Sequence, residues 1–345
     1  MLSPKVICIT PIKNEAWILE RFLKCSSIWA DHIIIADQNS TDDSREIARK
    51  FPKVILIENN SDDFNEPERQ KLLIEEARKI KGDRILIALD ADECLTGNFQ
   101  SSPEWNTVIT ATPGTVINFQ WINLLSDMEH CWIPAEDRAF GFIDDGISEH
   151  IGRAIHSQRV PIPAQAPTLL LKQIKVLHYQ YTDWTRMQSK HRWYQMWENI
   201  NYPGKSSISI YRRYNHMYPA SQKNLFRVRG HWLKSYIRAG IDMTSTSISS
   251  ASYWWDKEAI CLLEKYTPKY FRTINIWDCP WKNISSEDSL LVKDPRSIAD
   301  KILHIWLRKT QAFLHEEHST GAHWIHYILR LSVRTTDKVL MLLGF

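Results

Sequence analysis

Short apolar runs recur through the N-terminal quarter of the chain, and each ends in a polar loop. They occupy Lys5–Thr10, His32–Asp37, Val54–Glu58 and Arg84–Leu89. Near-continuous apolar runs of this length are typical of strands buried on both faces, as in a parallel sheet. The segments between them carry apolar residues at helical spacing. The pattern therefore predicts a β-α-β-α-β-α-β order, with helices covering the sheet.

Later segments predict more strands and then a helical region. Strands are expected at Thr115–Leu125, Ala139–Ile143 and Leu169–His178, and helices at Tyr253–Lys265, Ser297–His315 and Ala322–Leu343. From about residue 185 the pattern turns helical and rich in Trp, Tyr and Arg. We expect an α/β fold with a mostly parallel sheet in residues 1–200. Residues 201–345 are expected to form a mainly helical, basic, aromatic-rich extension.

Composition narrows the class of protein without naming a function. The 345 residues are 43% hydrophobic and 24% charged, which fits a globular chain and excludes wholesale disorder. No apolar run approaches the roughly 20 residues that a membrane span needs, and we expect no signal peptide. The six cysteines are scattered without a CxxC pair. A cytoplasmic protein without a disulfide framework is the simplest interpretation.

Charge divides the chain into two halves of opposite sign. Residues 1–150 hold 15 Lys and Arg against 26 Asp and Glu, whereas residues 151–345 hold 28 against 14. An acidic half can hold cations, and a basic half can face phosphates or an anionic membrane. The basic aromatic residues Tyr211–Tyr214, Arg227, Arg229, Lys234 and Arg238 are candidates for holding a phosphorylated glycolipid or contacting an anionic leaflet. A solvated helical face over a Trp-rich core is the alternative.

Polar residues gather where the predicted strands end. Lys13, Asn14 and Glu15 follow the first strand, Asp37 ends the second, and Asp90-Ala91-Asp92-Glu93 follows the fourth. In a parallel α/β sheet, ligands bind beyond the carboxyl ends of the strands. Two carboxylates one residue apart can reach one Mg²⁺ or Mn²⁺ ion. Such a cation neutralises a departing diphosphate.

Three segments together resemble a known family. Thr10–Glu15, Ala30–Asp42 and Arg84–Glu93 are similar, in order and spacing, to the nucleotide-sugar-binding half of family 2 glycosyltransferases. The resemblance implies the GT-A fold, which is Rossmann-like with a mostly parallel sheet flanked by helices. The branch with a DxDE metal motif includes bacterial enzymes of lipopolysaccharide and cell-envelope glycan assembly.

The resemblance also assigns roles to individual residues. It implies that the donor nucleotide is bound by Pro11, Lys13, Asn14, Glu15, Asp37, Arg69 and Asp90. Asp92 would be the main ligand of a Mn²⁺ or Mg²⁺ ion, with His178 and Asp90 as further ligands. Asp37 would contact the base. Because Gln38, Asn39 and Asp43 depart from the smaller residues common in relatives, the identity of the base stays open, with a UDP-sugar favoured.

The general base that deprotonates the acceptor hydroxyl is expected at Glu149. The segment Ile147–His150 is similar to the part of the family that carries a late His/Glu pair. Glu136 and Asp137 superficially match an "ED" signature and are the alternative, followed by Asp144 and Asp145.

We therefore expect an inverting, metal-dependent glycosyltransferase that moves a sugar from a nucleotide-sugar donor to a hydroxyl of a glycan, glycolipid or other cell-envelope acceptor. A sugar-1-phosphate nucleotidyltransferase is one alternative, although Thr10–Glu15 lacks the glycines of its phosphate loop. A non-catalytic nucleotide-sugar-binding scaffold is another. Nucleic acid is not an expected partner. Contact with the inner face of the cytoplasmic membrane and self-association are both open.

Overall fold

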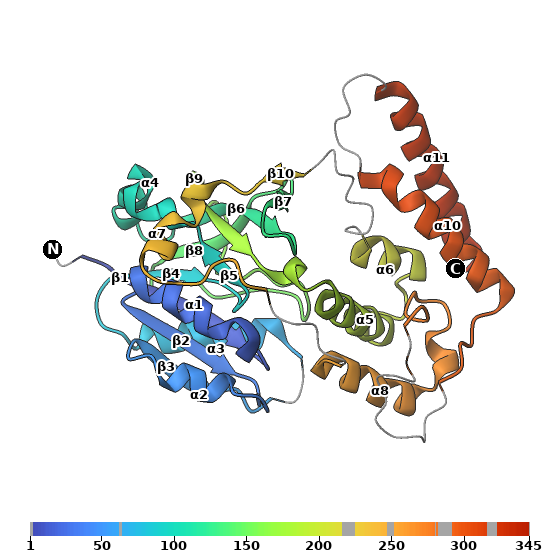
Figure 1. The fold of residues 1–345 in the computed structure, drawn as a ribbon, viewed down its shortest axis with the longest axis horizontal. Helices are drawn as coiled ribbons and strands as arrows, with labels where there is room; N and C mark the ends of the chain where they lie inside the picture. The colour runs from blue at the N-terminus through green and yellow to red at the C-terminus, as the bar shows by residue number, and fades with distance from the viewer. Residues whose placement is uncertain are drawn as a thin grey trace. The chain divides into compact units, whose positions relative to one another are not determined.

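The computed structural model describes residues 3–61, 64–215, 225–246, 252–279, 281, 292–315 and 323–344. The chain divides into two compact units (Figure 1). The first unit comprises Met1–Thr182 and Phe226–Ser247, and the second comprises Asp183–Leu225 and Ile248–Phe345. The sequence placed this division near residue 200 and did not foresee that a later segment returns to the first unit. The Ser-rich run Thr244–Ser252, which from the sequence is the best candidate for a loop between the two parts, lies largely outside the described residues.

One mixed sheet organises the first unit. Its strands are β1 (Lys5–Ile12), β2 (His32–Asp37), β3 (Val54–Glu58), β4 (Arg84–Ala88), β5 (Glu93–Leu95), β6 (Val116–Leu124), β7 (His130–Trp132), β8 (Arg138–Asp144), β9 (Thr168–His178) and β10 (Phe226–Arg227). The main order is β10-β7-β6-β8-β4-β1-β2-β3, and β9 pairs with β6 and β5. Strands β3, β2, β1 and β4 are all parallel, whereas β8 runs antiparallel to both β4 and β6.

Helices cover both faces of the parallel strands, as expected. The helices of the first unit are α1 (Ala16–Trp29), α2 (Ser44–Arg49), α3 (Glu66–Arg78), α4 (Pro103–Ile109) and α7 (Lys234–Arg238). Alternate residues of each buried strand point to opposite faces. Cys8 and Ile33 therefore pack with α1 and α2, whereas Ile7 and Ile34 pack with α3. The expected α/β architecture is confirmed, and the antiparallel strands make the sheet mixed.

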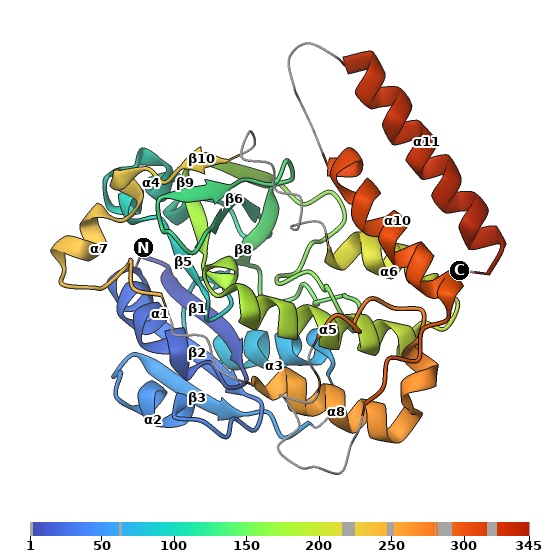
Figure 2. The same ribbon diagram turned by 45° about the vertical axis from the view of Figure 1, so that its right-hand side comes forward.

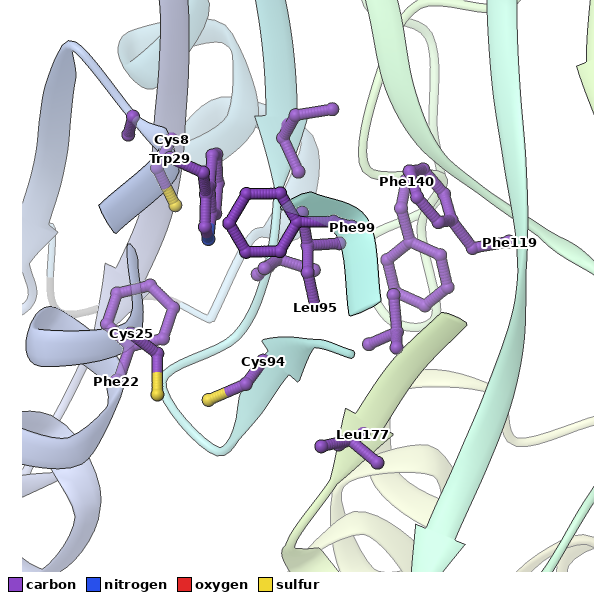
Figure 3. Packing of buried hydrophobic residues seen from close by; sticks show 14 of the residues in the cluster. Cys8, Phe22, Cys25, Trp29, Cys94, Leu95, Phe99, Phe119, Phe140 and Leu177 are labelled. Carbon is purple, nitrogen blue, oxygen red and sulfur yellow. The ribbon is translucent and has the colours of Figure 1, made fainter. Parts of the chain in front are cut away.

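The larger core lies on the α1 side of the sheet and extends to β6 and β9 (Figure 3). Figure 3 shows Phe22 and Trp29 of α1 on one side of this core and Phe119 and Phe140 on the other. The returning segment adds Tyr236, whose hydroxyl donates to the carbonyl of Leu95 at 3.0 Å. All six cysteines are unpaired, in agreement with the expectation of no disulfide framework.

The second unit is helical in its described part. It contains α5 (Trp184–Asn201), α6 (Ser207–Tyr214), α8 (Trp254–Tyr266), α10 (Ile298–His315) and α11 (His323–Leu342). Its main core joins Met196, Ile210, Leu263 and Phe271. A smaller cluster packs α6 against α10 through Ile208 and Leu307. Figures 1 and 2 both show α11 lying alongside α10. No helix in the described ranges is both long and apolar enough to pass through a bilayer.

Candidate active site

Five strands of the first unit deliver polar and aromatic side chains to one edge of the sheet. This is the edge where β1, β2 and β4 have their carboxyl ends, since these strands are parallel. Asp92 follows β4, and Trp121 and Asn123 lie near the end of β6. His178 ends β9, in register with Asn123. The structure thus brings together segments that are widely separated in the sequence.

His178 is held by Asn123 so that its other ring nitrogen faces Asp92. Nδ1 of His178 lies 2.6 Å from Oδ1 of Asn123, so Nδ1 carries the proton and donates it. Nε2 of the ring then lies 3.7 Å from Oδ2 of Asp92. His178 and Asp92 are both 3% exposed. A hydrogen bond that fixes the tautomer of a histidine in this way is the usual support of a metal ligand.

The spacing of these two atoms fits a shared cation. Two donors that each bind a divalent ion at about 2.0–2.2 Å lie roughly 3–4 Å apart. Across the described residues, no group of three or more His, Cys, Asp or Glu side chains is arranged to hold a metal ion. Asp92 and His178 therefore offer two protein ligands, and the remaining positions fall to water or to substrate oxygens.

Trp121 forms an aromatic wall behind His178. The two rings stack with centroids 4.4 Å apart and an angle of 13° between their planes. Tyr181 meets His178 edge-on at 5.7 Å. The guanidinium groups of Arg138 and Arg159 lie 4.9 and 5.6 Å from the centre of the Trp121 ring. Burial and the nearby charge of Arg159 lower the pKa of Arg138. The site therefore concentrates positive charge next to its carboxylates.

Arg159 binds both remaining acids of the Asp90–Glu93 segment. One of its Nη atoms donates to Oδ2 of Asp90 at 2.6 Å, and the other donates to Glu93. Glu93 also accepts from the backbone N–H of Asp90 at 2.8 Å. Its carboxyl is fully buried, and burial raises its pKa to about 7 against the opposing charge of Arg159. Asp90, expected as a metal ligand, has one carboxylate oxygen paired with this arginine, and its role toward a metal stays a prediction.

Asn14 joins the two loops that precede α1 and α2. Its side-chain oxygen accepts from the backbone N–H groups of Thr41 and Asp42 at 2.7 and 3.3 Å. Its own N–H donates to the hydroxyl of Ser40 at 2.9 Å. The backbone φ of Asn14 is 57°, a left-handed conformation that asparagine tolerates better than most residues. The structure thus gives Asn14 a role in loop geometry.

Asp37 is buried at the end of β2 with one oxygen bound and one left over. Oδ2 accepts from Nε of Arg45 at 2.5 Å and from the N–H of Ser40 at 3.3 Å. Oδ1 is buried and has no hydrogen-bond partner among the described residues. A buried carboxylate oxygen without a donor is costly, so this atom is a candidate acceptor for a ligand N–H or hydroxyl.

The other predicted donor-binding residues lie around the same edge. Pro11 and Lys13 are half-buried near the end of β1. Glu15 accepts from Nε1 of Trp17 at 2.7 Å. Arg69 lies in the first turn of α3, with its guanidinium 4.8 Å from the centre of the Phe64 ring.

Glu149 is placed at the opposite edge of the sheet. Strand β8 is antiparallel to β4, so Asp144 at its end lies beside Arg84, the first residue of β4. The carbonyl of Ser148 accepts from Arg78, the last residue of α3, at 2.7 Å. Glu149 follows directly and is exposed. A helix the length of α3 spans about 20 Å. Strand β8, which precedes Glu149, runs away from Asp92, so this placement does not favour Glu149 as catalytic base, and that role stays a prediction.

The direction of β8 also places the other candidates for the general base at one or the other edge of the sheet. Asp144 is bound by Arg78 and Arg84, and Asp145 accepts from the hydroxyl of Ser148, so both lie at the edge away from Asp92. Glu136 and Asp137 precede Arg138, at the start of β8, and are exposed. This places them at the carboxyl edge of β4, with Arg138 and Asp92.

Sequence reasoning missed Trp121, Asn123, Arg138 and Arg159. Trp121 and Asn123 lie in a predicted strand whose alternating apolar and polar residues do not mark either of them as functional. Arg159 lies in a long loop, Asp145–Pro167, with no motif around it. Only the pairing of β6 with β8 and β9 shows that these segments meet.

Comparisons with known proteins agree with this geometry in the N-terminal part. Residues 7–100 match the family model described as "Glycosyl transferase family 2". This segment contains most of β1, all of β2 through β5 and the Asp90–Glu93 motif. The match supports assignment of the chain as a glycosyltransferase, and the matched segment covers little more than a quarter of the chain. No curated protein matches the sequence.

Several solved structures show a distant similarity. TarS from S. aureus is 9% identical, with 99% of this chain and 92% of that chain covered and a TM-score of 0.37. Glucosyl-3-phosphoglycerate synthase from Mycobacterium tuberculosis is 17% identical, covering 34% of this chain and 44% of that one, with a TM-score of 0.25. 4-Diphosphocytidyl-2C-methyl-D-erythritol synthase is 13% identical, covering 34% of this chain and 61% of that one, with a TM-score of 0.27. The chain thus spans less than two thirds of the last two proteins, and at these scores none carries an argument about activity.

Proposed function

We propose that the first unit transfers a sugar from a nucleotide-sugar donor to a hydroxyl acceptor with inversion at the anomeric carbon. The observation that carries this proposal is that His178, oriented by Asn123, faces Asp92. Asp92 lies within the segment that matches family 2 glycosyltransferases. A nucleoside diphosphate leaving group needs positive charge and hydrogen-bond donors, and both are present around Trp121.

Asp92 and His178 would hold the divalent cation. Its chemistry is to neutralise the charge that develops on the departing diphosphate. Mg²⁺ prefers oxygen ligands alone, so the imidazole ligand favours Mn²⁺. Asp90 is bound to Arg159 and is better suited to orient that arginine or a ribose hydroxyl.

The protein groups have separate tasks. The unpartnered Oδ1 of Asp37 accepts from the nucleoside, and Arg138 and Arg69 bind phosphate oxygens. Glu136 or Asp137 removes the proton from the acceptor hydroxyl. The acceptor oxygen then bonds to the anomeric carbon as the bond from that carbon to the phosphate oxygen breaks, and the nucleoside diphosphate leaves. We propose that the acceptor is a glycan or glycolipid of the cell envelope, which is the acceptor class that the sequence resemblance implies.

Donor binding is tested by a thermal-shift panel of UDP, GDP, CDP, ADP and dTDP, each with and without Mn²⁺. A ligand that binds only the folded chain stabilises it by about 2.7 kcal/mol at a hundred times its dissociation constant. We expect one nucleotide to raise the melting temperature only with Mn²⁺. The substitution Asp92→Asn should remove that shift.

The matched control is Asp83→Asn, which removes an exposed acid just before β4. It should keep the full shift. A shift that survives Asp92→Asn, or no shift with any nucleotide, contradicts the proposed donor site. Release of the nucleoside diphosphate from the matching nucleotide-sugar then tests transfer itself.

A further inference from the structure

Helix α11 presents an apolar face to solvent. The large exposed side chains along it are Trp324, Tyr327, Ile328, Leu331, Val339 and Leu342. Trp324 is 68% exposed and Leu342 is 87% exposed. Their spacing of three or four residues places most of them on one side of the helix. Large exposed apolar patches of this kind mark an interaction surface.

The orientation of α11 is fixed by a buried acid on its other side. Asp337 is 5% exposed and accepts from Nε and Nη2 of Arg212 at 2.9 and 3.0 Å. Its Oδ1 also accepts from Nε1 of Trp306 at 3.0 Å. Turning the helix to bury the apolar residues would break this network and expose Val333, which is now buried. The apolar face is therefore held outward.

Helix α10 continues the same kind of surface. Ile298, Ile302 and Ile305 are exposed and recur at helical spacing, and Lys309 follows on the same side. We call the exposed residues Ile298, Ile302, Ile305 and Lys309 of α10, together with Trp324, Tyr327, Ile328, Leu331, Arg334, Lys338, Val339 and Leu342 of α11, the α10–α11 face.

In the described residues of α10 and α11, the exposed charged side chains are all basic. The acids of these two helices, Asp300 and Asp337, are buried. Lys301 and Arg308 pair with Asp294 and Asp278.

By contrast, the part of the chain described here shows no ion pair for three exposed basic residues of the face: Lys309, Arg334 and Lys338. Two copies of such a face would bring like charges together, so the charge disfavours self-association and favours an anionic partner.

We propose that the α10–α11 face docks on the surface of an anionic phospholipid bilayer. Apolar and aromatic side chains enter the interface while basic side chains meet lipid phosphates. The exposed Trp and Tyr suit the headgroup region. A surface helix of this type lies on the membrane, which agrees with the finding that no described helix could cross one. This surface differs from the basic aromatic residues around Tyr211–Tyr214 that the sequence suggested. There, Arg212 forms an ion pair with Asp337, and Tyr211 and Tyr214 are buried.

The test is sedimentation of the full chain with vesicles. One set contains phosphatidylcholine alone, and the other contains equal parts of phosphatidylcholine and phosphatidylglycerol. We expect binding to the anionic vesicles, weakened by added salt. Replacing Arg334 and Lys338 by Gln should lower the partition coefficient by about fivefold for each charge. Replacing Trp324, Ile328 and Leu331 by Gln should lower it by roughly a hundredfold.

Matched controls use exposed residues of the first unit. Ile147→Gln with Ile151→Gln removes exposed apolar side chains, and Arg49→Gln with Lys50→Gln removes exposed charges. Both should leave vesicle binding unchanged. Circular dichroism and the melting temperature of every variant should match those of the parent, because all of these side chains are exposed.

Three results would overturn the proposal. The chain could stay in the supernatant with anionic vesicles, or the α10–α11 variants could bind as the parent does. Alternatively, light scattering could show a dimer that the apolar variant dissociates, which would make the face an interface between copies. These measurements use no nucleotide, so their failure is distinct from failure of the proposed transferase function.

Discussion

The carboxamide oxygen of Asn123 lies 2.6 Å from Nδ1 of His178, and this contact decides which nitrogen faces Asp92. Both residues are buried, and they lie opposite each other on β6 and β9. The nitrogen of the Asn123 carboxamide has no hydrogen-bond partner among the described residues. The contact therefore orients the ring of His178 through one atom of the carboxamide.

Removing this support should weaken metal binding more than folding. We expect Asn123→Ala to lower the affinity for Mn²⁺, measured with the nucleotide that binds, by about 10–100-fold. The melting temperature without metal should fall only modestly. Asn118→Ala, on the same strand but half-buried, is the control and should keep the affinity. Equal loss of affinity in both variants would show that His178 does not depend on Asn123.

Arg159 should be a large contributor to the stability of the first unit. It is the cation between Asp90 and Glu93, and its loss leaves a buried carboxylate unpaired. We expect Arg159→Met to cost about 3 kcal/mol in the free energy of unfolding, measured by urea denaturation. Arg153→Met, exposed in the same loop, should cost little.

The same variant allows a second check on Arg159. Adding Glu93→Gln to Arg159→Met should recover part of the lost stability, because the buried charge is then gone. A double variant as unstable as the sum of the two single variants would show that Arg159 acts by packing on Phe140, where its guanidinium lies 4.8 Å from the ring centre, and not by charge.

The general base should be found before β8 and not after it. We expect Asp137→Asn or Glu136→Gln to lower the turnover number by 10²–10⁴-fold, the usual contribution of a general base. Glu149→Gln should leave turnover unchanged, since Glu149 lies at the edge where β4 begins. Turnover is measured as release of the nucleoside diphosphate with acceptor present. Loss of turnover in Glu149→Gln alone would refute the placement.

His304 should make the second unit sensitive to acid. Its Nε2 donates to the carbonyl of Thr273 at 2.9 Å, so Nδ1 is the atom that accepts from Arg296 at 3.1 Å. Burial lowers the pKa of His304, with the charge of Arg296 acting in the same direction. The folded state therefore binds the proton less readily than the unfolded state, whose histidines titrate near 6.5. Stability should be complete above that value and fall as the pH drops below it.

The matching variant is His304→Gln, which keeps a donor and an acceptor but does not titrate. The melting temperature of the parent should decline faster than that of the variant between pH 7 and pH 5. If the melting temperatures of parent and variant fall in parallel with pH, protonation of His304 does not destabilise the folded chain.

Much of the first unit followed from periodicity. The strands β1 to β4 and the helices between them were predicted because each apolar run is short and each helix shows its buried stripe. The short strands β5, β7 and β10 were not predicted, since two or three residues carry no period. Strand β10 pairs with β7 across nearly a hundred residues of sequence, which no local pattern can show.

The sequence by itself determined the α/β class, the polar ends of β1, β2 and β4, and Asp92 as the acid that follows a buried strand. Local patterns suffice there, because the residues of one motif are neighbours in the chain. Only the tertiary structure decided that the strand before Glu149 runs away from Asp92, that Arg159 pairs with Asp90, and that α11 turns its apolar side outward. Each depends on strand direction or on a partner distant in sequence, and long-range pairing leaves no trace in the spacing of residues along the chain.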